Sequence, residues 1–165
     1  MNRSELHCYI EDNIVVSSRQ IIQYFVSQGK TNTSVRKSIS RLKDPFRSVS
    51  KIHLANKAKI FYHKAFWKTP DYCEKLTKIL LEEHSVYGYA LEALRAKSGF
   101  IVEKDFPIIC GSGNQKGHIP PELIKQNLLD SGLLSSINIE AMGTYLYLSA
   151  YNNISVQADE TMRII

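Results

Sequence analysis

Residues 30–68 read KTNTSVRKSISRLKDPFRSVSKIHLANKAKIFYHKAFWK, and they hold most of the positive charge of the chain. Eleven lysines and arginines stand in this stretch against one acid, Asp44, which gives it a formal charge of +10. The whole chain of 165 residues carries +5, so all other residues together sum to −5. Charge gathered in this way concentrates a polyanion beside one part of a molecule. A solvated face without a partner is the simpler explanation, but the apolar pattern inside the stretch favours a binding surface.

The pattern from Thr31 to Lys43 predicts one short helix with an apolar face and a basic face. One apolar stripe follows helical spacing: Val35, Ile39 and Leu42. The hydroxyl of Thr31 can accept hydrogen bonds from the free amides of the first turn, and Asp44-Pro45 ends the helix. The opposite face then carries Arg36, Lys37, Ser40 and Arg41, with Lys43 beside it.

The flanking segments complete a small domain. Upstream, a short strand at 14–16 precedes a helix at 18–28, with Ser17 or Ser18 as its N-cap and Gly29 as a left-handed terminator. A helix, a Gly-containing turn and a capped basic helix form the helix-turn-helix pattern. Downstream, residues 48–54 and 58–63 predict two strands of a β-hairpin that turns at Asn56.

This order resembles the winged helix-turn-helix superfamily over about the first 65 residues. The matching segments are Val15-Val16-Ser17-Ser18, Thr31 to Leu42 and Ile52 to Tyr62. The resemblance implies a helix that enters the major groove of double-stranded DNA and a hairpin wing along its backbone or in its minor groove. The expected DNA-binding residues are Thr31, Thr33, Arg36, Lys37, Ser40, Arg41, Lys43, Lys57 and Lys59.

The rest of the chain repeats the pattern without visible sequence identity. Residues 1–68 form the basic unit, with a first helix at 4–12, and Thr69-Pro70-Asp71 marks the boundary. The second unit, 69–150, has expected helices at 72–84, 86–97 and 120–128, strand-like segments at 100–102 and 107–110, and a hairpin of 137–140 with 144–148. We interpret 99–118 as an insertion, and 151–165 either packs back as a strand or begins a longer region. The fold class is therefore α+β, mostly helical, with tandem winged-helix units.

The last helix of the second unit is net acidic, since Glu122 and Asp130 outnumber Lys125. Such a helix repels phosphates, so we expect this unit to serve packing, partner binding or homodimer formation through residues 69–150.

The composition of the chain indicates the cellular compartment in which it works. Hydrophobic content of 44% and charged content of 22% are typical of globular proteins. No apolar run approaches the roughly 20 residues of a membrane span, and the N-terminus lacks the apolar core of a secretory signal. Three scattered cysteines fit free thiols better than a disulfide framework. We therefore expect a cytoplasmic protein without a membrane partner.

Candidate chemical sites are weak. The loop 111–118 lacks the Gly-Lys-Ser/Thr ending of a phosphate-binding loop. Cys110 and His118 have no second pair of zinc ligands, and Glu103 with Asp105 lack a third carboxylate. We expect no catalytic residue, no metal and no cofactor, and hence no enzyme.

Three functions fit the sequence. The first is a small transcription regulator that binds double-stranded DNA sequence-specifically. The second is the DNA-recognition module of a larger DNA-acting protein, such as a defence or mobile-element enzyme. The third is a protein-interaction module whose basic face binds an acidic partner. Stacking of single-stranded bases on Trp67 is a further alternative, although coverage of the core is the favoured explanation of this residue.

Overall fold

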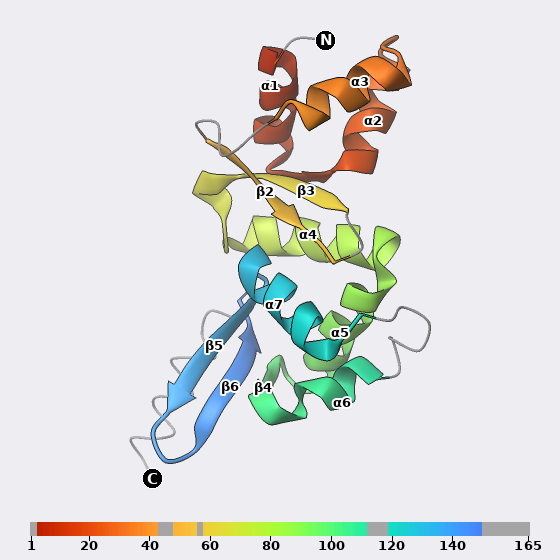
Figure 1. The fold of residues 1–165 in the computed structure, drawn as a ribbon. Helices are drawn as coiled ribbons and strands as arrows, with labels where there is room; N and C mark the ends of the chain where they lie inside the picture. The colour runs from red at the N-terminus through yellow and green to blue at the C-terminus, as the bar shows by residue number, and fades with distance from the viewer. Residues whose placement is uncertain (1–2, 43–47, 56–57, 112–118, 150–165) are drawn as a thin grey trace. The chain divides into compact units, whose positions relative to one another are not determined.

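The computed structural model describes residues 3–42, 48–55, 58–111 and 119–149, which belong to two compact units, Met1–Trp67 and Lys68–Ile165 (Figure 1). Each unit combines helices with an antiparallel sheet of three strands. The expected fold class, α+β and mostly helical, is confirmed. Among the described helices, none has both the length and the apolar character of a membrane span.

The first unit begins with three helices and one short strand and ends with a hairpin. Its elements are α1 (Arg3–Asn13), β1 (Val15–Ser17), α2 (Ser18–Ser27), α3 (Asn32–Ser40), β2 (Val49–His53), β3 (Lys59–His63) and the 3-10 turn η1 (Lys64–Phe66). The sheet has the order β1-β3-β2, with Val16 opposite Phe61 and Ile52 opposite Ile60. In Figure 1 the three helices gather on one side of β2 and β3.

Local sequence fixes the connection between α2 and α3. The Ser17 hydroxyl accepts from the Gln20 amide at 3.1 Å while the Gln20 side chain accepts from the Ser17 amide at 3.0 Å, a capping box. At the other end, Gly29 has φ +94° and the Lys30 amide donates to Phe25 O at 3.0 Å, which closes a Schellman motif. Thr31 then caps α3 by accepting from the Ser34 amide at 3.1 Å. The predicted caps and terminator are confirmed.

The apolar face of α3 lies in the core of the unit. Val35 is fully buried, and Ile39 and Leu42 are nearly so. They belong to one cluster with residues of α1, α2 and the sheet: Leu6, Ile10, Val16, Ile21, Phe25, Val49 and Phe61. The predicted stripe therefore orients α3, and the polar residues between its members face outward.

The helix α3 ends earlier than predicted. The spacing predicts a helix up to Lys43, but α3 stops at Ser40 and Arg41 is its C-cap. The Leu42 amide donates to Ile39 O at 3.1 Å, so the chain tightens to an i to i+3 bond that keeps Leu42 buried. The ammonium of Lys51 on β2 satisfies Leu42 O at 3.2 Å. The predicted stop at Asp44-Pro45 lies outside the described residues.

Eight elements are seen in the described residues of the second unit, 68–111 and 119–149. They are α4 (Pro70–Glu83), α5 (Ser85–Ala96), β4 (Phe100–Val102), the 3-10 turn η2 (Glu103–Asp105), α6 (Phe106–Gly111), α7 (Pro121–Ser131), β5 (Leu134–Ile139) and β6 (Gly143–Leu148). The sheet has the order β4-β6-β5. Thr69 caps α4, and Gly132, with φ +82°, ends α7. The strand β5 starts three residues before the predicted Ile137, because Leu134 and Ser135 are both buried and leave no alternating pattern to read.

One predicted strand is wrong. The segment 107–110 is part of the helix α6. Phe106, Ile109 and Cys110 are buried at helical spacing, while Ile108 is 75% exposed. Pro107 fits because the first turn of a helix needs no amide donor from it. A short apolar run has the same composition in a buried strand and in a buried helix, so the sequence could not separate them.

The segment interpreted as an insertion, 99–118, contributes β4 and α6 to the second unit. With these elements included, the order α5-β4-α6-α7-β5-β6 matches the order α1-β1-α2-α3-β2-β3. In both sheets the last strand lies between the other two. The two units thus share an arrangement, and α7 holds the place in its unit that α3 holds in the first.

Truncation of Ile39, a buried apolar residue of α3, should destabilise the first unit. We expect Ile39→Ala to lower the free energy of unfolding by about 2–5 kcal/mol, because the substitution leaves a cavity in the core cluster. The exposed neighbour Lys37 provides the control, and Lys37→Ala should change stability by no more than about 0.5 kcal/mol. Urea unfolding followed by circular dichroism measures both, and equal effects would contradict the observed orientation of α3.

Candidate nucleic-acid interface

The first unit carries a net positive charge and the second a net negative charge. Residues 1–67 hold twelve lysines and arginines against four acids, a net charge of +8, whereas residues 68–165 hold nine against twelve, a net charge of −3. The acids in the described part of the first unit all lie on α1: Glu5, Glu11 and Asp12. Glu5 lies 4.0 Å from the ammonium of Lys30, and Glu11 lies 3.9 Å from the imidazole of His63. Neither α3 nor the strands β2 and β3 contain an acid.

The outer face of α3 collects most of the predicted DNA-binding residues. Thr33, Arg36, Lys37 and Ser40 are exposed at helical spacing, and Arg41 is exposed at the C-cap. Lys37 and Arg41 take part in no ion pair within the described part of the chain. The first turn of α3 contains no acid that would offset the positive end of the helix dipole. This face therefore presents cations, hydroxyls and free amides together.

Three of the predicted side chains have internal hydrogen bonds. The hydroxyl oxygen of Thr31 accepts from the Ser34 amide, and the Ser40 hydroxyl donates to Lys37 O at 2.9 Å. Arg36 donates from Nε to Oδ1 of Asn32 at 2.5 Å. These bonds hold the side chains close to the helix and leave most of the arginine fork outward.

The other predicted DNA-binding residues, Lys43, Lys57 and Lys59, are not part of the exposed face of α3 that the structure describes. Lys59 begins β3 and is half-buried, and its carbonyl accepts from the Ser18 hydroxyl at 3.3 Å. It therefore belongs to a different element from the residues of α3. Lys43 and Lys57 lie outside the described residues, so their predicted roles stay predictions.

Two residues with clear roles escape sequence reasoning. Asn32 orients Arg36, and the spacing i, i+4 was the available signal, since such pairs meet on a helix surface. Lys51 counts among the eleven cations of the basic stretch, but its ammonium is engaged by Leu42 O. No local sequence pattern links Lys51 to Leu42, because their contact depends on how β2 packs beside the residues that follow α3.

The helix α7 occupies the corresponding place in the second unit and differs electrostatically. The ammonium of Lys125 lies 2.9 Å from Glu122 and 3.6 Å from Glu103. The hydrogen bond with Glu122 is the main reason why the pKa of Lys125 is raised. The charge of Lys125 is therefore engaged by two carboxylates. This helix offers no cationic face for phosphates, as its acidic composition indicates.

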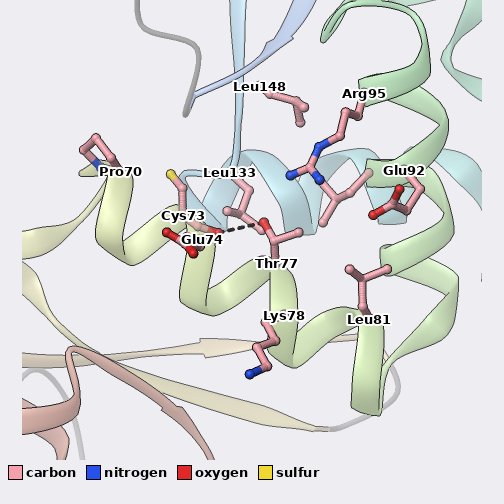
Figure 2. A pocket seen from close by; sticks show the side chains of 11 residues that line it. Pro70, Cys73, Glu74, Thr77, Lys78, Leu81, Glu92, Arg95, Leu133 and Leu148 are labelled. Carbon is pink, nitrogen blue, oxygen red and sulfur yellow. Dashed lines mark hydrogen bonds between the residues drawn. The ribbon is translucent and has the colours of Figure 1, made fainter.

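The described part of the second unit contains a groove (Figure 2). It has a volume of about 520 Å³ and lies between α4 and α5, with Leu133 and Leu148 from the sheet end. Leucines line it, and charged residues of both signs surround them: Glu74, Lys78, Glu92 and Arg95. Burial raises the pKa of the Cys73 thiol to about 11, so at neutral pH it stays protonated and is a poor nucleophile.

The other chemical candidates have limited support. Glu103 lies in η2 and pairs with Lys125, as a surface carboxylate does. Among the residues that the structure describes, no three His, Cys, Asp or Glu side chains are grouped in a way that could hold a metal ion. Trp67 is 39% exposed directly after η1. The loop 112–118 is not among the described residues.

No protein-family model matches this chain, and no curated protein matches it in sequence. The geometry and charge of the two units are therefore the basis for inferring a function. The most informative comparison is internal, between α3 and α7. Equivalent positions carry an acid-free cationic face in one unit and an ion-paired lysine in the other.

Lys51 should act on stability because its ammonium donates to Leu42 O, just after the C-cap of α3. We expect Lys51→Met to lower the free energy of unfolding by about 1–2 kcal/mol, since Leu42 O loses a charged donor. Lys64→Met is the control, because Lys64 is exposed in η1 and should tolerate the change. Chemical unfolding of both variants tests this, and an unchanged midpoint for Lys51→Met would contradict a structural role.

Proposed function

We propose that this protein binds double-stranded DNA through its first unit, as a winged helix-turn-helix regulator of transcription. The observation that carries the proposal is the exposed, acid-free face of α3, held outward by the buried stripe of Val35 and Ile39. A helix of this size fits the major groove of B-DNA, where side chains reach the base edges. The element order of the first unit is the one that this superfamily resemblance requires.

The residues of this face suit different parts of a duplex. Arg36 and Lys37 lie in the middle of α3 and Ser40 is its last residue, and all three would meet base edges. Thr31 and Thr33 lie at the positive N-terminal end of α3, where backbone amides and hydroxyls bind phosphate. Lys59, together with Lys57, would follow the DNA backbone from the hairpin. Such phosphate contacts fix orientation, while the base contacts select a sequence.

The two alternatives to this proposal are a DNA-recognition module of a larger protein and a protein-interaction module, and only the second requires a different ligand for α3. A recognition module of a larger DNA-acting protein would use the same surface of α3, so it shares the chemistry of the proposal. A protein-interaction module would use the basic face against an acidic protein. The mixture of arginine, lysine and hydroxyl side chains along one face of α3, with an acid-free first turn, favours phosphate and base edges over a carboxylate surface.

Charge reversal on α3 should remove DNA binding without unfolding the protein. We expect Arg36→Glu with Arg41→Glu to weaken affinity for duplex DNA by about 100-fold or more, because two favourable contacts become repulsive. Both side chains are exposed and neither belongs to the core cluster, so circular dichroism should be unchanged. A fluorescence anisotropy titration measures the affinity.

The matched control reverses two exposed lysines of the second unit, Lys78→Glu with Lys104→Glu, and should retain nearly full affinity apart from a general charge effect. For the unmodified protein, log affinity should fall against log salt with a slope of about −4 to −5 if about five phosphates are contacted. Unchanged affinity in the folded Arg36/Arg41 variant would refute the proposal. A flat salt dependence with tight binding to an acidic protein would favour the interaction module.

We also propose that the second unit binds protein, most simply a second copy of the chain through residues 69–150. The net charge of −3 and the ion-paired Lys125 are unfavourable for DNA. Large apolar side chains are exposed on several of its elements: Leu81, Tyr89, Ile108, Leu123 and Met142. Exposed apolar area of this kind is typical of protein contact surfaces. A dimer would bring two copies of α3 to one DNA site.

Separation of the two units should separate the two activities. A fragment of residues 1–68 should be monomeric and keep weak duplex binding, because its core cluster is internal to it. A fragment of residues 69–165 should self-associate and bind no DNA. Sedimentation velocity and the same DNA titration measure both properties. DNA binding by the second fragment alone would show that the roles are reversed.

A further inference from the structure

The starting observation is the hydrogen bond between Arg36 and Asn32. Nε of Arg36 donates to Oδ1 of Asn32 at 2.5 Å, across one turn of α3. Both side chains are exposed, so neither packing nor burial explains the contact. The guanidinium is planar, and one bond at Nε together with the helix backbone restricts the direction of that plane. The four N–H groups at the tip of the fork then remain available to a ligand.

The partner that holds Arg36 is neutral. An amide oxygen accepts the Nε hydrogen without cancelling the positive charge of the guanidinium. The second unit shows the contrasting case, in which the carboxylate of Glu122 holds Lys125 and offsets its charge. Arg36 is therefore oriented and still fully cationic. That combination is favourable for a ligand with two acceptor atoms side by side.

We propose that Asn32 is a positioning residue for Arg36, and that the end of the Arg36 fork reads one guanine through its O6 and N7 atoms. This inference depends on the proposed DNA-binding function of α3. Guanine presents these two acceptors in the major groove, and a planar fork matches them bidentately. Arg36 lies one turn inside the helix, between Thr33 and Ser40 on the exposed face, whereas phosphate contacts belong to the helix end.

Lys37 and Arg41 serve as internal references. Neither side chain shares a hydrogen bond with a neutral side chain in the described part of the structure. Lys37 is a point charge without a fork, so it can neutralise phosphate but offers no bidentate geometry. Bidentate reading of guanine is therefore assigned to Arg36, because its fork is the one that a neutral side chain orients.

The experiment uses the full chain and a duplex selected from a random pool. Each guanine of the selected site is replaced in turn by 7-deazaguanine, which pairs normally but lacks the N7 acceptor. One position should cost the unmodified protein about tenfold in affinity, and Arg36→Lys should reduce that cost to about twofold or less while keeping the charge. Asn32→Ala should reduce the discrimination at the same position severalfold and leave the salt slope unchanged.

Two further variants separate orientation from charge. Asn32→Ala should have no further effect on discrimination in the Arg36→Lys background, because the two residues act through one contact. Asn32→Asp keeps the acceptor and adds a negative charge, so it should retain discrimination while lowering affinity for all duplexes alike.

The outcomes are distinct. If Asn32→Ala weakens all duplexes equally, or changes nothing, Asn32 does not position a base-reading group and the inference is wrong. If no 7-deazaguanine position depends on Arg36, that side chain contacts phosphate and the inference is also wrong. If selection yields no enriched duplex and the salt slope is flat, the proposed DNA binding itself fails.

Discussion

The burial of one apolar stripe determines what the first unit can do. Val35 and Ile39 of α3 pack with Phe25 of α2 and Phe61 of β3. Each such side chain contributes about 1.5–3 kcal/mol when it leaves water, whereas two exposed like charges about 6 Å apart repel by roughly 0.7 kcal/mol in water. The stripe therefore outweighs the repulsion among the cations on the outer face. A dense positive surface is possible because the opposite side of the same helix is held firmly.

The two units place different chemistry on one arrangement of elements. In the first, the acids of the described residues are confined to α1, and α3 is left cationic. In the second, Glu122 and Glu103 surround Lys125 of α7, and apolar side chains such as Tyr89 are exposed. Charge distribution, and not element order, thus distinguishes a surface suited to a polyanion from one suited to a protein. The proposed division between DNA binding and self-association follows from this difference.

Most of the first unit could be predicted from sequence because its signals are local. Ser17, Gly29 and Thr31 act on amides within one turn of helix, so their positions alone define where α2 and α3 begin and end. The second unit was harder, since 107–110 forms a buried helix whose apolar run also fits a strand. If 107–110 is taken as a strand, β4 and α6 lose their match with β1 and α2 and resemble an insertion. The contact just after the end of α3, from the Lys51 ammonium to Leu42 O, likewise joins elements that are distant in sequence.

In the candidate site, as in the fold, the sequence predicts the composition of a surface but not the contacts between its side chains. Composition predicts that α3 is cationic, but not which cation a neighbouring side chain orients. Asn32 holds Arg36 through a neutral oxygen, while Glu122 holds Lys125 through a charged one. Both pairs are local on a helix, yet one keeps a positive charge for a ligand and the other offsets it. A protein that must attract DNA generally and still choose a sequence requires the first kind of pair, because orientation without neutralisation retains the long-range attraction and adds geometry at close contact.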